Sequence, residues 1–113
     1  LRPAVVSIDA WTYAREFLLY LDEIAEYMED GGVVAWGIVP ADYTVFAAEG
    51  PDSFFSRFQE IRARATGTID PGLFDHQSMI TPTCGIKTTG VREAVAIMEA
   101  TAALSRRLRG EEV

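Results

Sequence analysis

Several residue types are scarce in this 113-residue sequence, and each scarcity excludes a class of protein. A single cysteine, Cys84, excludes an internal disulfide and a metal site built from cysteines alone. Lys and Arg number 10 against 17 Asp and Glu, and the resulting net charge of −7 argues against a broad electrostatic grip on nucleic acid or on an anionic membrane. The longest apolar run, 33–40, falls far short of the roughly 20 residues that a membrane-spanning helix needs.

The sequence nevertheless has enough apolar residues to build a packed core. Hydrophobic residues make up 49% of the chain and charged residues 24%, a composition that is neither disordered nor collagen-like. At this length the chain is one domain at most, and no low-complexity tract divides it. No basic segment precedes an apolar one near Leu1, so we see no signal peptide in this sequence and expect a cytoplasmic protein.

Three segments predict β-strands, and a helical pattern follows each of them. The predicted strands, which are rich in β-branched residues, are 4–10, 33–39 and 78–83. The predicted helices, in which apolar residues recur with a period of about 3.6, are 12–29, 52–65 and 91–109. Strands that alternate with helices form parallel sheets joined by right-handed crossovers, so we predict an α/β fold of three consecutive βα units.

Small and polar residues mark the ends of the predicted helices. Gly31 is a natural stop for the first helix. Asp52 or Ser53 can cap the start of the second helix, and Thr89 the start of the third. The segments 41–50 and 66–77, which show no clear period, are predicted to be extended loops.

The predicted sheet has one face that nothing in the pattern covers. Consecutive right-handed crossovers place all three helices on the same face, which leaves the other face bare and both edges of the sheet open. Yet the segment 33–39 is apolar at nearly every position, as in a strand that is covered on both sides. We therefore expect the bare face to be covered by another copy of the chain or by the missing part of a larger fold.

Two segments resemble the same protein family. The segment Met79 to Gly85 (MITPTCG), with the helix that follows it to Arg109, is similar to the C-terminus of cobalamin-independent methionine synthases and their shorter relatives. The segment 31–40 (GGVVAWGIVP) resembles the preceding strand of those proteins, whose superfamily of (β/α)8 barrels also includes uroporphyrinogen decarboxylases. The resemblance implies that residues 1–113 are a single partial domain, the last three units of a TIM barrel, which needs about 250 residues.

The resemblance also implies a chemistry. In this family a zinc ion activates a thiol such as homocysteine, which takes a methyl group from a folate or a methylated corrinoid. Zinc lowers the pKa of the bound thiol and so provides a thiolate at neutral pH. The family's last zinc ligand is the cysteine of a C-terminal CG motif, which here is Cys84. The other ligands, a His-x-Cys pair and a Glu, lie on earlier units, and no His-x-Cys occurs here, so we expect the isolated chain to be inactive.

Two carboxylates are candidates for contact with a substrate. Asp9 ends the first predicted strand and Asp42 follows the second, so both should lie at the same rim as Cys84. There they could bind a substrate amine or act in proton transfer, and Asp9 is the better candidate. Helix caps or loop hydrogen bonds are the alternative roles. The only histidine, His76, should lie at the opposite end of the last strand, about 26 Å from Cys84, too far to share a zinc ion with it.

Other interpretations of the sequence remain open. The chain could be a small non-enzymatic α/β module that self-associates through its exposed sheet face. It could also belong to the same barrel superfamily with decarboxylase or other chemistry, although Cys84 followed by Gly85 favours the zinc branch. Trp11 and Trp36 are predicted to be core residues, with a pocket lining as the alternative. Because a bare sheet face would be an exposed apolar patch, we expect a homo-oligomer in solution.

Overall fold

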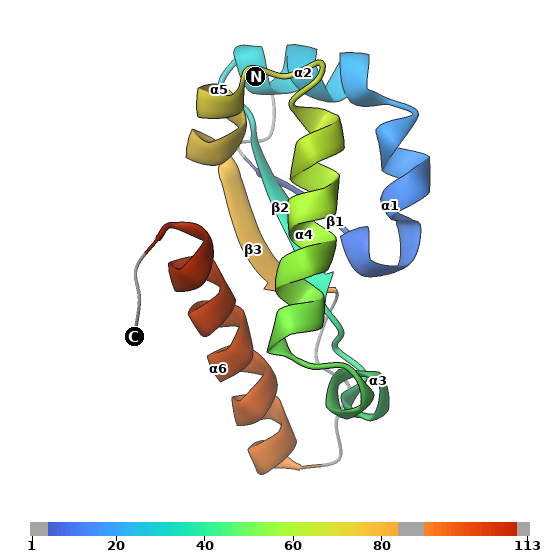
Figure 1. Cartoon of the computed structure of the whole chain (residues 1–113), viewed down its shortest axis with the longest axis vertical. Coiled ribbons are helices and arrows are strands. Elements are labelled where there is room, and N and C mark those ends of the chain that lie inside the picture. The colour runs from blue at the N-terminus through green and yellow to red at the C-terminus, as the bar shows by residue number, and fades with distance from the viewer. Residues whose placement is uncertain (1–4, 84–89, 111–113) are drawn as a thin grey trace.

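Three parallel strands form a single sheet in the computed structural model, which describes residues 5–83 and 90–110. The strands are β1 (Val5–Ile8), β2 (Val33–Val39) and β3 (Ser78–Pro82), and they lie in the order β1-β2-β3. The strands run side by side (Figure 1), and the register pairs Ile8 with Trp36 and Trp36 with Ile80. The predicted α/β fold with a parallel sheet is therefore confirmed.

The described residues form six helices. These are α1 (Ala10–Leu18), α2 (Leu21–Glu29), α3 (Tyr43–Ala48), α4 (Pro51–Ala65), α5 (Pro71–His76) and α6 (Val91–Leu108). The helices predicted over 52–65 and 91–109 correspond to α4 and α6. The prediction of a single helix over 12–29 is wrong, because the helix is interrupted at Leu19 and Tyr20. The N–H groups of these two residues bond to the carbonyls three residues earlier, which tightens the last turn of α1.

The segments predicted as extended loops contain short helices, so that prediction was wrong. Each of these helices begins after a capping aspartate: Asp42 Oδ1 accepts from the Thr44 N–H at 2.9 Å, and Asp70 Oδ2 from the Leu73 N–H at 3.1 Å. The six residues of α3, or of α5, are too few to display a 3.6-residue period. Sequence periodicity therefore misses them.

The remaining helix ends differ in how well they were predicted. The cap of α4 is Gly50 followed by Pro51, not Asp52 or Ser53, because proline suits the first helical position. Gly31, with φ of 98°, follows α2 as predicted and adopts a conformation that favours glycine. The predicted cap Thr89 lies outside the described residues.

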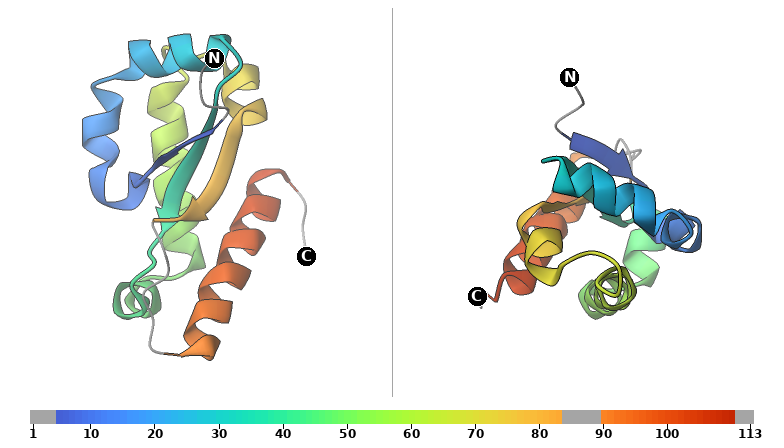
Figure 2. Two further views of the ribbon diagram at one scale, coloured as in Figure 1. Left: turned by 180° about the vertical axis from the view of Figure 1, so that it is seen from behind. Right: turned by 90° about the horizontal axis from the view of Figure 1, so that it is seen from above.

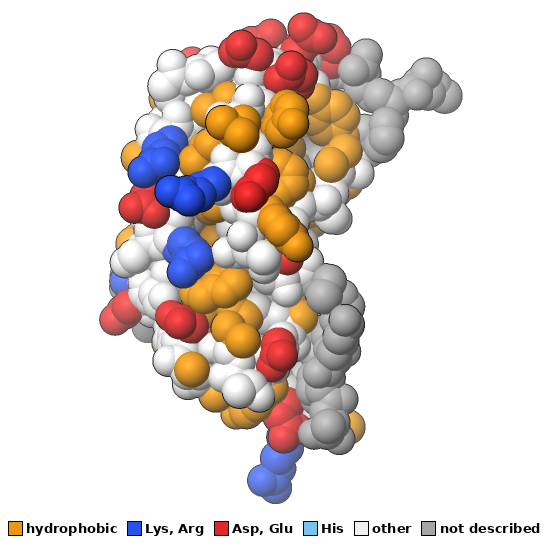
Figure 3. Space-filling model, turned by 90° about the vertical axis from the view of Figure 1, so that its right-hand side faces the viewer, with side chains coloured by type: hydrophobic (Ala, Val, Ile, Leu, Met, Phe, Trp, Pro, Cys, Tyr) orange, Lys and Arg blue, Asp and Glu red, His pale blue; other side chains and the backbone are white. Residues whose placement is uncertain are grey.

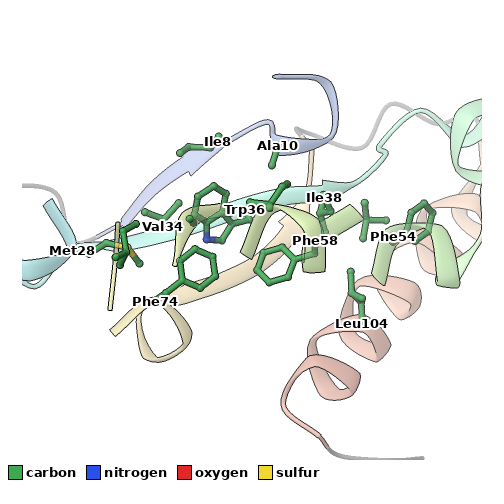
Figure 4. Packing of buried hydrophobic residues seen from close by; sticks show 14 of the residues in the cluster. Ile8, Ala10, Met28, Val34, Trp36, Ile38, Phe54, Phe58, Phe74 and Leu104 are labelled. Atoms are coloured by element: carbon green, nitrogen blue, oxygen red, sulfur yellow. The ribbon is translucent and has the colours of Figure 1, made fainter. Parts of the chain in front are cut away.

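The core lies between the sheet and the helices α1, α4 and α6, which share one face of the sheet (Figures 1 and 2). Trp36 of β2 is at its centre, with 1% of its surface exposed, and its Nε1–H donates to Ser78 Oγ at 2.9 Å. The rings of Phe58 and Phe74 pack against it with centroids 6.4 and 5.5 Å away (Figure 4). Trp36 is thus a core residue, as predicted.

The other face of the sheet is less apolar in its middle than the sequence suggested. Side chains alternate along a strand, so the residues in the middle of β2 that face away from the helices are Ala35 and Gly37, which carry little or no side chain. The large apolar residues exposed there are on the flanking strands: Val5 of β1 at 46% and Met79 of β3 at 47%. Apolar exposure therefore concentrates at the two edges of the sheet.

A helix that spans a membrane must match the thickness of the bilayer's hydrocarbon core. A span needs roughly 20 predominantly apolar residues. None of the helices within 5–83 and 90–110 is both long enough and apolar enough to cross a membrane.

Candidate functional site

The carboxyl ends of the three strands meet at one edge of the sheet, where the sequence predicted a site. Asp9 directly follows β1, Asp42 follows β2 after a short link, and Thr83 follows β3. Thr83 ties two of these ends together, because its N–H donates to Val39 O at 2.9 Å and its Oγ1 accepts from the Ala41 N–H at 3.0 Å. The next residue, Cys84, lies outside the described residues.

Both predicted carboxylates act as helix caps. Asp9 Oδ1 accepts from the Thr12 N–H at 3.0 Å at the start of α1, and Asp42 Oδ1 accepts from Thr44 at the start of α3. These bonds satisfy backbone donors that a helix leaves free at its N-terminus. The alternative role named for both residues is therefore present, and contact with a substrate stays a prediction.

The single histidine of the sequence lies at the opposite end of β3 from this edge. His76 is the last residue of α5 and comes just before β3 begins, whereas Thr83 follows the other end of β3. Over the described ranges there is no group of three or more His, Cys, Asp and Glu side chains that could hold a metal ion. The described residues alone therefore do not form a zinc site.

A cavity lies between α1 and α4 and begins close to the helix start that Asp9 caps. It has a volume of about 570 Å³, and Trp11 and Arg57 are among the residues that line it. The Arg57 guanidinium sits 3.7 Å from the centre of the Trp11 ring, and its Nη1 donates to Trp11 O at 3.0 Å. Trp11 also meets Phe54 edge to face at 5.7 Å. Trp11 is therefore half-buried and lines a pocket, which was the alternative to its predicted core role.

A second hollow, nearly all apolar, borders β1. It has a volume of about 290 Å³, and its apolar lining comes from β1, β2, α1 and α2: Val6, Ile8, Phe17, Tyr20, Ile24, Tyr27 and Val34. Sequence periodicity does not reveal this surface, because its helical residues follow the same period as those of a buried face. Nothing in the periodicity distinguishes an apolar stripe that is covered from one that is open.

One ion pair perturbs the titration of its members. Arg62 of α4 and Asp75 of α5 make two parallel hydrogen bonds, Nε to Oδ1 and Nη2 to Oδ2, each of 2.8 Å. This hydrogen bonding lowers the pKa of Asp75 and raises the pKa of Arg62, while partial burial works against both shifts. The pair links α4 to α5 on the surface and has no visible connection with the carboxyl edge.

Comparisons of the chain with protein-family models, curated proteins and solved structures found no match. A function can therefore be inferred only from the residues themselves and from the geometry of the carboxyl edge. That edge holds two capping carboxylates and the tie made by Thr83.

Proposed function

We propose that this chain supplies the last three βα units of a (β/α)8 barrel methyltransferase that resembles the cobalamin-independent methionine synthases. The reaction moves a methyl group from a folate or a methylated corrinoid to a thiol such as homocysteine, in the cytoplasm. The observation that carries the proposal is the position of Thr83 at the carboxyl edge of a parallel sheet, directly before Cys84. Barrel enzymes have their active sites at this edge.

The shape of the sheet supports a barrel. Its strands are all parallel, its helices α1, α4 and α6 lie on one face, and the middle of β2 carries small residues on the other face. The two neighbouring strand ends approach closely at Gly37: a Cβ there would lie 2.8 Å from both Ile8 O and Thr83 Cα. A wall of parallel strands with helices on its outer face is the architecture of a (β/α)8 barrel.

Zinc binding by the proposed enzyme needs residues beyond those described here. Cys84 is the one ligand that the resemblance assigns to this chain, and the described residues do not complete a site around it. The remaining ligands would come from the other units of the barrel. Asp9 and Asp42, which already cap helices, would contact the substrate through carboxylate oxygens at the same edge.

The proposal is tested first on the protein in its source cells. An antibody raised against this chain should detect a polypeptide several times heavier than 12.4 kDa on a blot. That polypeptide, once purified, should contain one zinc per chain by atomic emission and should methylate homocysteine with a methylated folate or corrinoid. Cys84→Ser should abolish the zinc and the activity together. Met79→Leu, which removes the sulfur atom of β3, should keep the zinc and serves as the matched control.

Three results would overturn the proposal. A native band at the mass of this chain would favour the alternative, a non-enzymatic α/β module. A longer polypeptide without zinc would remove the proposed chemistry. Zinc retained at full stoichiometry in Cys84→Ser would show that this cysteine is not a ligand.

A further inference from the structure

The edge strand β1 lacks the cover that its neighbour has. β2 is buried at nearly every position because it lies between two strands and helices cover one of its faces, whereas Val5, Val6 and Ser7 of β1 are all exposed. The hollow beside β1, called here the β1 groove, is formed by Val6, Ile8, Phe17, Tyr20, Ile24 and Tyr27. Figure 3 views the α1 side of the molecule and shows hydrophobic side chains gathered below a group of acidic ones.

An apolar stripe runs along α6 at the other edge of the sheet. The α6 stripe consists of Val91, Val95, Met98 and Ala102, all exposed, with Met98 at 60% and Val91 at 81%. Their spacing places them on one side of the helix. The opposite side faces α4, since Arg107 pairs with Asp52 at 2.8 Å and lies 3.9 Å from the Phe55 ring. The α6 stripe therefore points away from the rest of the chain.

The β1 groove and the α6 stripe would meet if the sheet of one copy continued into the sheet of a second copy. Across the sheet the helices lie in the order α1, α4, α6, and each packs on its neighbour. A helix placed in the β1 groove would pack beside α1, in the same way that α1 packs beside α4. An α6 from a second copy can take that place when its β3 edge runs beside the β1 edge, because both strands point the same way. The α6 stripe would then fill the β1 groove.

Charge favours the same arrangement. The helix α2 carries a run of exposed acids: Asp22, Glu23, Glu26 and Glu29. The C-terminal end of α6 carries Arg106 in its last turn and Arg109 at its cap, whereas Arg107 is already paired with Asp52 on the other side of the helix. Within the chain, the C-terminal end of α4 lies beside that of α1, since Arg64 and Leu18 line one cavity. By the same geometry, the basic end of an incoming α6 would lie beside the junction of α1 and α2, where Glu23 lines the β1 groove.

We infer that this chain assembles head to tail with a second copy of itself, the α6 stripe and β3 edge of one copy docking on the β1 groove and β1 edge of the next. Such a contact joins two different surfaces, so it builds rings when the rotation closes and longer chains when it does not. The inference goes beyond the proposed function and concerns the 113-residue chain by itself, because in the proposed barrel other units of a longer polypeptide would cover the same two edges.

Light scattering and sedimentation of the purified 113-residue chain test the assembly. The mass should rise with protein concentration above that of a 12.4 kDa monomer, and added salt should weaken the association by screening the charges. Met98→Glu should weaken it roughly tenfold or more, because the contact would then bury a charge. Tyr20→Lys, at a position 57% exposed, should do the same from the groove side.

Mixing the two variants distinguishes a head-to-tail contact from a symmetric one. Met98→Glu keeps an intact groove and Tyr20→Lys keeps an intact stripe, so the mixture should form a one-to-one dimer that grows no further. Val45→Glu, which changes an exposed residue of α3 outside both surfaces, should associate as the unmodified chain does. Unchanged circular dichroism and urea midpoints in the variants show that the fold is kept.

Several outcomes would overturn the inference. The unmodified chain could remain a monomer at every concentration, which would leave these edges to other segments of a longer polypeptide. Both variants could associate normally, which would point to the sheet face with Val5 and Met79. The mixture could fail to pair, which would indicate a symmetric interface. None of these results bears on zinc, so the proposed function stands or falls separately.

Discussion

At the scale of single residues, Gly37 is the position where the sheet tolerates no side chain. A Cβ on residue 37 would lie 2.8 Å from Ile8 O and from Thr83 Cα, and 3.0 Å from Pro82 O. All three are backbone atoms, which cannot move aside as a flexible side chain can. Gly37→Ala should therefore lower the free energy of unfolding by about 1–3 kcal/mol, the usual cost of overpacking, as measured by urea denaturation.

Gly67→Ala is the matched control for this prediction. A Cβ at Gly67 would meet only Arg64 O, at an ordinary distance of 3.4 Å, and the residue is exposed after α4. Its free energy of unfolding should change by no more than about 0.5 kcal/mol. Equal effects from the two substitutions would mean that the close approach at Gly37 does not govern stability.

The sequence predicted where the candidate site residues lie better than it predicted what they do. Asp9 and Asp42 come directly after or close behind strands, and parallel strands end at one edge, so their placement follows from chain order. Their cap bonds to Thr12 and Thr44 depend on where each helix starts, which periodicity locates only within a few residues. The contact of Arg57 with Trp11 joins residues far apart in sequence, and no local pattern signals it.

At the scale of the helices and strands, the Arg62–Asp75 pair connects α4 to α5. The pKa of Asp75 is lowered in the folded state by its hydrogen bonds to Arg62. A depressed pKa contributes stability above the unfolded pKa, near 3.9, and this contribution disappears as the pH falls through the folded pKa. Asp75→Asn should thus cost about 0.5–1 kcal/mol at pH 7, since the pair is exposed, and nothing at the acid end.

Urea denaturation of both proteins between about pH 2 and 7 measures this difference. The two stability curves should converge on acidification. Glu60→Gln removes a carboxylate from an exposed position on the same helix α4 and should stay within about 0.5 kcal/mol of the unmodified chain at every pH. A constant gap between the Asp75→Asn protein and the unmodified chain at all pH values would contradict an electrostatic origin.

Element boundaries reveal the limit of periodicity as a signal. The apolar positions Phe17, Tyr20 and Ile24 fit a single helix, yet the chain changes direction between α1 and α2 and keeps these residues on one apolar surface. The period records which side chains are apolar and not the path of the backbone. For the same reason it located α4 and α6 closely, since both are straight and long enough to repeat the pattern several times.

At the scale of the whole molecule, alternation of strands and helices was enough to predict a parallel sheet with helices on one face. The right-handed crossovers add successive βα units in one direction along the sheet, and this determines which edges stay open. The distribution of apolar exposure could not be predicted in this way. The middle of the open face is occupied by Ala35 and Gly37, and the large exposed apolar side chains lie instead on the flanking strands, in the β1 groove and on the α6 stripe.

This uneven cover predicts how the strands differ in hydrogen exchange. Amides of β2 are hydrogen-bonded between two strands and buried, so they should exchange most slowly. In contrast, β1 is an exposed edge, and none of the described residues protects its outward-facing amides.

If copies join head to tail, those β1 amides become hydrogen-bonded to β3 of the next copy. Raising the protein concentration should therefore slow exchange in β1 and leave β2 unchanged, as measured by mass spectrometry or NMR. The Met98→Glu protein should lack this concentration dependence, because it cannot present the α6 stripe. Protection of β1 that is already high in dilute solution would mean that something other than a second copy covers this edge.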